Sequence, residues 1–318
     1  MTPSTAPTTT RIRAYFAPVD RTAAAPTLFD PAQLATFPLD TPPTPWIDLG
    51  FISQFMRKSG TKIQPLLAGA PAAPIAQVRT EVDATVSFEF DAWGKLQAAL
   101  ASGSQQMNLL ATPPGATPQG SGGTAALPVA ILTTGITASA LNVGTTAAAQ
   151  FAPGDIVAVD ADYTGQTGYL GAGISAAYLR TALTADINYI RRVTLNVAVV
   201  ASIADGILTL ASPLPAGVPS ADMQISRVIG FVDREGASFF QEFSAFFVLD
   251  GTQGDRVFFH YPRLQPMQAS SEHSEALASP VTRIRLAAAF RALPVRDAND
   301  GESVVAFRSY IPAPLRAI

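Results

Sequence analysis

The sequence predicts a mainly β protein, namely an antiparallel β sandwich or barrel with one short packed helix and a small inserted β-barrel-like module. Three features support this fold class. Several long stretches alternate apolar and polar residues with the period of two that a half-buried strand requires. Short strand-like segments follow one another over residues 151–232, and the Asp-Gly pair at Asp205 and Gly206 predicts a hairpin turn between two of them. Helical spacing is confined to short stretches.

A strand that runs directly into a helix is the most informative part of the chain. Residues 80–100 read TEVDATVSFEFDAWGKLQAAL, and strict alternation gives way there to helical spacing. We expect the apolar side of the strand to pack on the helix. This expected helix–sheet core consists of Val86, Phe88, Phe90, Trp93, Leu96 and Leu100. The other side of the strand carries an acidic row, which consists of Glu81, Asp83, Glu89 and Asp91.

Changes in composition divide the chain into four parts. Residues 1–45 are rich in proline, which predicts an extended arm that docks either on its own chain or on a neighbouring copy. Residues 46–150 and 233–318 contain the long amphipathic strands and predict two parts of one larger β domain. Residues 151–232 predict the inserted module.

Composition narrows the possible partners. The 318-residue chain is 48% hydrophobic and has a formal net charge of −3, which argues against a protein that grips nucleic acid by neutralising phosphates. A basic cluster at Arg57, Lys58 and Lys62 indicates either a solvated loop or a contact with an acidic partner surface. The N-terminus lacks the apolar region of a signal peptide and no long apolar run follows, which predicts a soluble protein outside the general secretory route.

Residues that could support catalysis are scarce. Cysteine is absent, and the imidazoles are His260, in an aromatic strand-like segment, and His273, in a polar segment. Residues 171–176 match the minimal GxGxxA pattern, but the β-α-β context of a dinucleotide site is missing. We therefore expect no enzymatic activity, no cofactor and no metal site.

Two segments together resemble the tail tube, or major tail, proteins of long-tailed bacteriophages. The first is TVSFEFDAWGKLQAALASG, in which an alternating strand passes through an acidic position into a helix with small and leucine residues. The second is DRVFFHYPRLQ, followed by a strand rich in small residues and by NDGESVVAF. The resemblance covers roughly residues 75–110 and 235–312 and consists of patterns of residue type.

The resemblance implies a β domain that assembles into six-membered rings, which stack into a hollow tube for DNA passage. It implies a place in the virion tail after assembly in the host cytoplasm. The implied partners are other copies of the chain and tail proteins such as the tape measure and the terminator, with no membrane and no specific DNA binding. The acidic row would then line the channel and keep DNA from sticking. Two alternatives remain open at this point, a carbohydrate-binding adhesin or fibre module and the inner tube of a contractile injection system.

Overall fold

The computed structural model separates the chain into two compact units. It describes residues 9–20, 25–32, 37–43, 46–102, 105–110, 129–161, 196–214, 216–221, 223–234, 242–252, 254–267, 271–278 and 281–313. The barrel unit comprises Met1–Val19, Ala23–Trp93 and Gln241–Ile318. The inserted unit comprises Gly94–Phe240 with Asp20–Thr22. Both units are built mainly from antiparallel strands, which confirms the predicted mainly β fold class.

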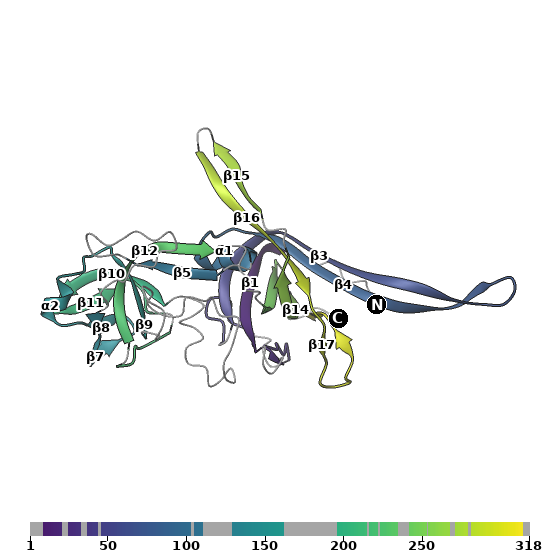
Figure 1. Ribbon diagram of the computed structural model, residues 1–318, viewed down its shortest axis with the longest axis horizontal. Helices are drawn as coiled ribbons and strands as arrows, with labels where there is room; N and C mark the ends of the chain where they lie inside the picture. The colour runs from purple at the N-terminus through teal and green to yellow at the C-terminus, as the bar shows by residue number, and fades with distance from the viewer. Residues whose placement is uncertain are drawn as a thin grey trace. The chain divides into compact units, whose positions relative to one another are not determined.

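The barrel unit contains a ring of six antiparallel strands. The strands of the whole barrel unit are β1 (Thr9–Asp20), β2 (Ala25–Pro26), β3 (Ile47–Ala68), β4 (Ala73–Phe90), β13 (Phe243–Gly251), β14 (Arg256–Pro266), β15 (Ser271–Ala278), β16 (Val281–Ala292), β17 (Val295–Arg296), β18 (Ser303–Val304) and β19 (Phe307–Ile311). The order β16-β4-β3-β1-β13-β14 returns to β16 through a short β14–β16 pairing, so the ring closes. Two hairpins, β3–β4 and β15–β16, extend beyond it (Figure 1).

Aromatic side chains fill the interior of the ring. Phe88 of β4 stacks on Phe290 of β16 with centroids 5.7 Å apart and meets Phe247 of β13 at 5.4 Å. Phe16 of β1 contacts Phe290 at 5.6 Å. These side chains alternate with outward residues along each strand, as the period of two demands. The alternation of β4 therefore places Val86, Phe88 and Phe90 in the barrel core, where each is at most 2% exposed.

The N-terminal segment is an integral part of the barrel. Residues 1–45 were expected to form an extended arm, whereas β1 lies inside the sheet between β3 and β13. Phe29, Phe37 and Trp46, which follow β1 in the chain, form a buried cluster with Tyr15 and Phe246 on the outer side of this sheet. The described part of the segment thus docks on its own chain, because its bulky residues cover an aromatic sheet face that water would otherwise reach.

The inserted unit is a second antiparallel sheet with its own core. Its elements are α1 (Lys95–Ser102), β5 (Gln105–Leu110), β6 (Val129–Ala130), β7 (Leu132–Thr137), β8 (Ala140–Asn142), α2 (Thr145–Ala148), β9 (Ile156–Ala161), β10 (Val197–Ala204), β11 (Ile207–Leu210) and β12 (Met223–Arg234). Asp205 and Gly206 join β10 to β11 with φ of 50° and 81°, as the Asp-Gly pair predicts. The compact unit extends over 94–240 and not only over 151–232, because β5, β6 and β8 pair with β12 and β11.

The helix α1 packs differently from the expectation. It lies in the inserted unit and contacts β5 and β12, whereas β4 belongs to the barrel unit. Leu100 is buried at 2% exposure, Trp93 is 53% exposed, and the side chain of Leu96 lies outside the described residues. Helical spacing reveals an apolar side but not the sheet on which that side packs.

Among the described residues, no helix is long and apolar enough to cross a membrane.

Candidate assembly surface and channel face

The β3–β4 hairpin is much longer than the barrel that holds it. β4 pairs with β16 only from Thr85 to Phe90, so Ala73–Ala84 extends past that pairing by twelve residues, about 40 Å at the usual strand rise. β3 leaves the ring at a register shift between Ser53 and Met56, where Gln54 has φ 51°. A bulge of this kind bends a strand at a barrel rim. Beyond the rim the two strands pair only with each other.

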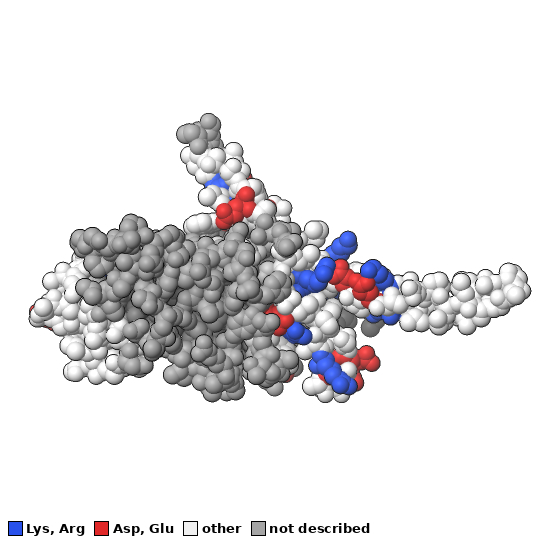
Figure 2. Space-filling view, viewed as in Figure 1, with Lys and Arg blue, Asp and Glu red and all other residues white. Residues whose placement is uncertain are grey.

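The far part of this hairpin is uncharged and exposed. From Ile63 to Val78 the sequence contains no Lys, Arg, Asp or Glu, and every residue is exposed. Its large apolar side chains expose 44–69% of their surface, and they are Ile63, Leu66, Leu67, Ile75 and Val78. Figure 2 shows the charged residues gathered near the base of the hairpin and a white surface from there to its tip. We call residues 63–78 the hairpin tip.

The predicted acidic row lies on one outer face of the barrel unit together with cations of neighbouring strands. Asp91 Oδ1 lies 2.8 Å from Arg285 Nη1, and Asp83 Oδ1 lies 3.3 Å from Arg291 Nε. Glu81 forms an ion pair with Lys62 across the β3–β4 ladder. We call this surface the paired-charge face.

Glu89 differs from the rest of the row because it is nearly buried. Its side chain is 11% exposed, and its carboxylate oxygens lie 3.8 Å from His273 Nε2 and 4.0 Å from Arg285 Nε. β15 extends the same face with Glu275, whose carboxylate accepts hydrogen bonds from Arg283 at 2.5 Å and Arg285 at 2.8 Å. These two hydrogen bonds lower the pKa of Glu275 to about 2, and the bond from Arg283 has the larger effect.

The face is therefore a lattice of compensated charges and not the bare acidic wall that the sequence suggested. Each of its five carboxylates, at positions 81, 83, 89, 91 and 275, lies within 4.0 Å of a cationic or ionisable nitrogen. The pairing partners come from β3, β15 and β16, so no single strand reveals them. The Arg-rich alternation of residues 283–291 was the available signal, but it becomes informative only once β16 is paired with β4.

The basic cluster lies on β3 and not in a loop, and two of its three residues contact other side chains of the chain. Arg57 Nε donates a hydrogen bond of 3.0 Å to Tyr261 Oη, and its guanidinium lies 5.1 Å from the ring centroid of Phe259. Lys62 binds Glu81, and Lys58 is exposed beside Thr85. Arg57 thus links the hairpin base to β14, and the exposed Lys62–Glu81 pair adds little to this link.

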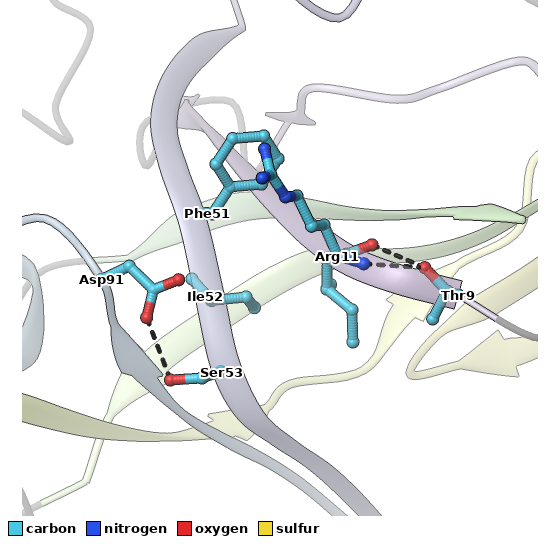
Figure 3. Close-up of a pocket in the computed structure, with 7 residues that line it drawn as sticks. Thr9, Arg11, Phe51, Ile52, Ser53 and Asp91 are labelled. Atoms are coloured by element: carbon cyan, nitrogen blue, oxygen red, sulfur yellow. Dashed lines mark hydrogen bonds between the residues drawn. The ribbon is translucent and has the colours of Figure 1, made fainter. Parts of the chain in front are cut away.

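A shallow pocket opens between β1, β3 and the end of β4 (Figure 3). Its volume is about 550 Å³, and its lining includes Arg11, Phe51, Ser53 and Asp91. The Arg11 guanidinium lies 5.0 Å from the Phe51 ring centroid, whereas Asp91 accepts hydrogen bonds from Ser53 and Arg285. Opposite charges line the two sides of the pocket and offset each other, so the pocket has no strong preference for a charged ligand.

His260 is buried beneath the N-terminal segment. It is 3% exposed, and its Nε2–H donates a hydrogen bond of 3.1 Å to the carbonyl oxygen of Thr27. Its Nδ1 has no hydrogen-bond partner among the described residues. Burial lowers the pKa of His260 to about 4, so the ring is neutral at pH 7. This histidine joins the segment at Thr27 to the sheet.

Within the described ranges, no three potential ligands gather in a way that could hold a metal ion. The GxGxxA segment lies outside the described residues. A scan against models of protein families finds no match, and a search of curated protein sequences also finds none.

Proposed function

We propose that the chain is a structural protein whose copies assemble into stacked rings that form a hollow tail tube for DNA passage. The observation that carries this proposal is the exposed β3–β4 hairpin. A two-stranded hairpin is marginally stable in water, and a contiguous exposed apolar surface marks an interaction site. A hairpin of this length and composition is expected to pack on a neighbour, and the resemblance to tail tube proteins makes a further copy the proposed neighbour.

The paired-charge face is the proposed wall of the channel. It is an outer face over β15, β16, β4 and β3, and small side chains at Ser87, Ala287 and Ala289 lie between its charged groups. Paired charges produce a weaker field at a distance than the uncompensated carboxylates that the sequence suggested, because the contributions of the two opposite charges cancel at distances longer than their separation. Such a wall would neither bind nor strongly repel a polyanion, and this property suits passage.

Partners and location follow from the same proposal. The resemblance to tail tube proteins implies further tail proteins at the ends of a tube, so the tape measure and the terminator are the proposed binding partners besides other copies of the chain. The virion tail is the proposed location, after assembly in the host cytoplasm. The inner tube of a contractile injection system would use the same ring architecture and belongs to the same class of function.

The carbohydrate-binding alternative has less support. Glycan sites commonly present aromatic rings to solvent, whereas the aromatic residues of β13 and β14 pack inside the barrel or beneath the N-terminal segment. Among the described residues, Trp93 is the only large aromatic side chain with most of its surface exposed.

Electron microscopy tests the proposal directly. The purified chain would be concentrated and imaged by negative stain, and its molar mass would be measured by light scattering across a concentration series. We expect rings or hollow tubes of uniform width, and a mass that rises with concentration because the contact is between copies. A monomer at every concentration, with no ring in the images, would contradict the proposal.

A further inference from the structure

The hairpin tip offers its faces, and not its edges, to a partner. Pro65 lies in β3, Pro71 in the turn and Pro74 in β4, and proline has no N–H to donate to an added strand. Prolines on exposed edges therefore oppose edge-to-edge pairing. The apolar side chains of the tip project from the faces of the ribbon, so docking by the faces remains.

A lipid bilayer is a poor occupant for this tip. An open ribbon of two strands leaves the backbone N–H and C=O groups of both outer edges unpaired, and hydrocarbon offers them no partner. The tip also contains two polar side chains, Gln64, which is paired with Val78, and Gln77, which is paired with Pro65. A protein surface can satisfy such groups, so the observations favour a protein partner.

The barrel unit itself contains a second exposed apolar patch. Outside β3 and β4, five large apolar side chains of the described part of this unit are exposed, and they are Leu28, Trp93, Leu277, Val281 and Ile284. Three of these five lie at the far end of the β15–β16 hairpin, each 55–56% exposed. This end projects from the ring separately from β3–β4 (Figure 1).

Charge supports a contact between the two hairpins of different copies. Arg79, next to the hairpin tip, and Glu272, on β15, are both exposed. Neither has an oppositely charged side chain within 4.0 Å among the described residues, although most charged groups nearby are paired. A contact between unlike patches is heterologous, and repetition of such a contact closes a ring or continues as a filament.

We propose that the hairpin tip of one copy packs by its faces on the exposed end of the β15–β16 hairpin of a second copy. This inference rests on the proposed self-assembly and identifies the two surfaces that meet. Each copy then contributes one long hairpin and receives another, so every subunit takes part in two identical contacts. Arg79 of one copy faces Glu272 of the next at the border of the contact.

Cross-linking between two single-cysteine chains tests the contact, because the natural chain contains no cysteine. An Ile75→Cys chain is mixed with an Ile284→Cys chain under assembly conditions and treated with a short bis-maleimide. Both positions are exposed, at 69% and 56%, so the substitutions should leave the fold intact. We expect a product of twice the chain mass in the mixture. The matched control pairs Ile75→Cys with Val218→Cys, an exposed site in the inserted unit, and should give little product.

Charge reversal provides an independent arm. Arg79→Glu and Glu272→Arg should each lower the cross-linked fraction about threefold, and the two reversed chains together should restore it, because facing like charges repel. Rings or tubes without the Ile75–Ile284 product would overturn this contact and leave self-assembly standing. The absence of both rings and product would overturn both proposals. Equal products in the test and control mixtures, or flotation of the chain with phosphatidylcholine–phosphatidylglycerol vesicles through its hairpin tip, would also overturn the contact.

Discussion

Two alanine substitutions in the same strand should differ greatly in their effect on the free energy of unfolding, because β4 passes from the barrel core to the solvent. Phe88 is 2% exposed, and its ring lies 5.0 Å from Phe90, 5.4 Å from Phe247 and 5.7 Å from Phe290. Phe88→Ala removes this packing and leaves a cavity, so we expect a loss of about 3–5 kcal/mol in the free energy of unfolding. Ile75, thirteen residues earlier, is 69% exposed. Ile75→Ala should change that free energy by less than about 0.5 kcal/mol.

Urea unfolding followed by tryptophan fluorescence measures both effects in dilute solution. The chain has two tryptophans, of which Trp46 is buried in the barrel unit at 5% exposure. Both tryptophans belong to the barrel unit, so their fluorescence follows that unit, and a Trp93→Phe background leaves the buried Trp46 as its single tryptophan reporter. This matters because two units need not unfold in one transition. The same variants would then be concentrated, where Ile75→Ala should weaken assembly while Phe88→Ala destabilises the subunit.

Two results would refute this reasoning. A loss below about 1 kcal/mol for Phe88→Ala would mean that the barrel interior is not closely packed there. A loss above about 2 kcal/mol for Ile75→Ala in the monomer would mean that the hairpin tip is buried in the isolated chain, contrary to its exposure in the structure.

Three further predictions concern titration and backbone conformation. His260 has a folded pKa of about 4 against an ordinary 6.5, so the stability that its neutral form contributes is present above pH 6.5 and is lost as pH falls toward 4. Urea unfolding at pH 7 and pH 4 should show a loss of about 3 kcal/mol in the free energy of unfolding at the lower pH, and the His260→Phe variant should lack this loss. Arg285→Ala should raise the pKa of Glu275 from about 2 toward its ordinary value, as NMR titration of the carboxyl would show. Gly206 and Gly217 both have positive φ, but an added Cβ at Gly206 would lie 2.6 Å from backbone atoms while Gly217 is open, so Gly206→Ala should lower the unfolding temperature clearly more than Gly217→Ala.

The fold class could be predicted because alternation is a local signal. The pattern of β4 predicted both the strand and its buried side at Val86, Phe88 and Phe90, and the Asp-Gly pair predicted the β10–β11 hairpin. The place of β1 could not be predicted in the same way. Nearby prolines suggested an extended arm that docks on its own chain or on a neighbouring copy. Ile12, Ala14 and Phe16 alternate with polar or outward residues, but only long-range pairing with β13 shows the strand's position in the sheet.

The candidate surfaces were harder to predict because they depend on register between distant strands. Arg285 reaches Asp91 across 194 residues of sequence, so the row of carboxylates looks unpaired when β4 is considered alone. The hairpin tip did have a local signal, since uncharged residues surround Gly69 and Pro71 between two strand-like segments. Its apolar composition was compatible with burial, and only the structure shows that the segment is exposed.

Continuity of β3 and β4 has a mechanical consequence. The two strands pair from Ile52 and Phe90 in the barrel to Ala68 and Ala73 beside the turn, without an intervening loop or hinge element. A pull on the tip along the strands would load in shear the ladders that hold β3 to β1 and β4 to β16, so several backbone hydrogen bonds would share the force. A force on the far end of the hairpin would be transmitted along the strands to the aromatic interior through Phe88 and Phe90. The hairpin would therefore resist stretching, because its base is anchored in the barrel.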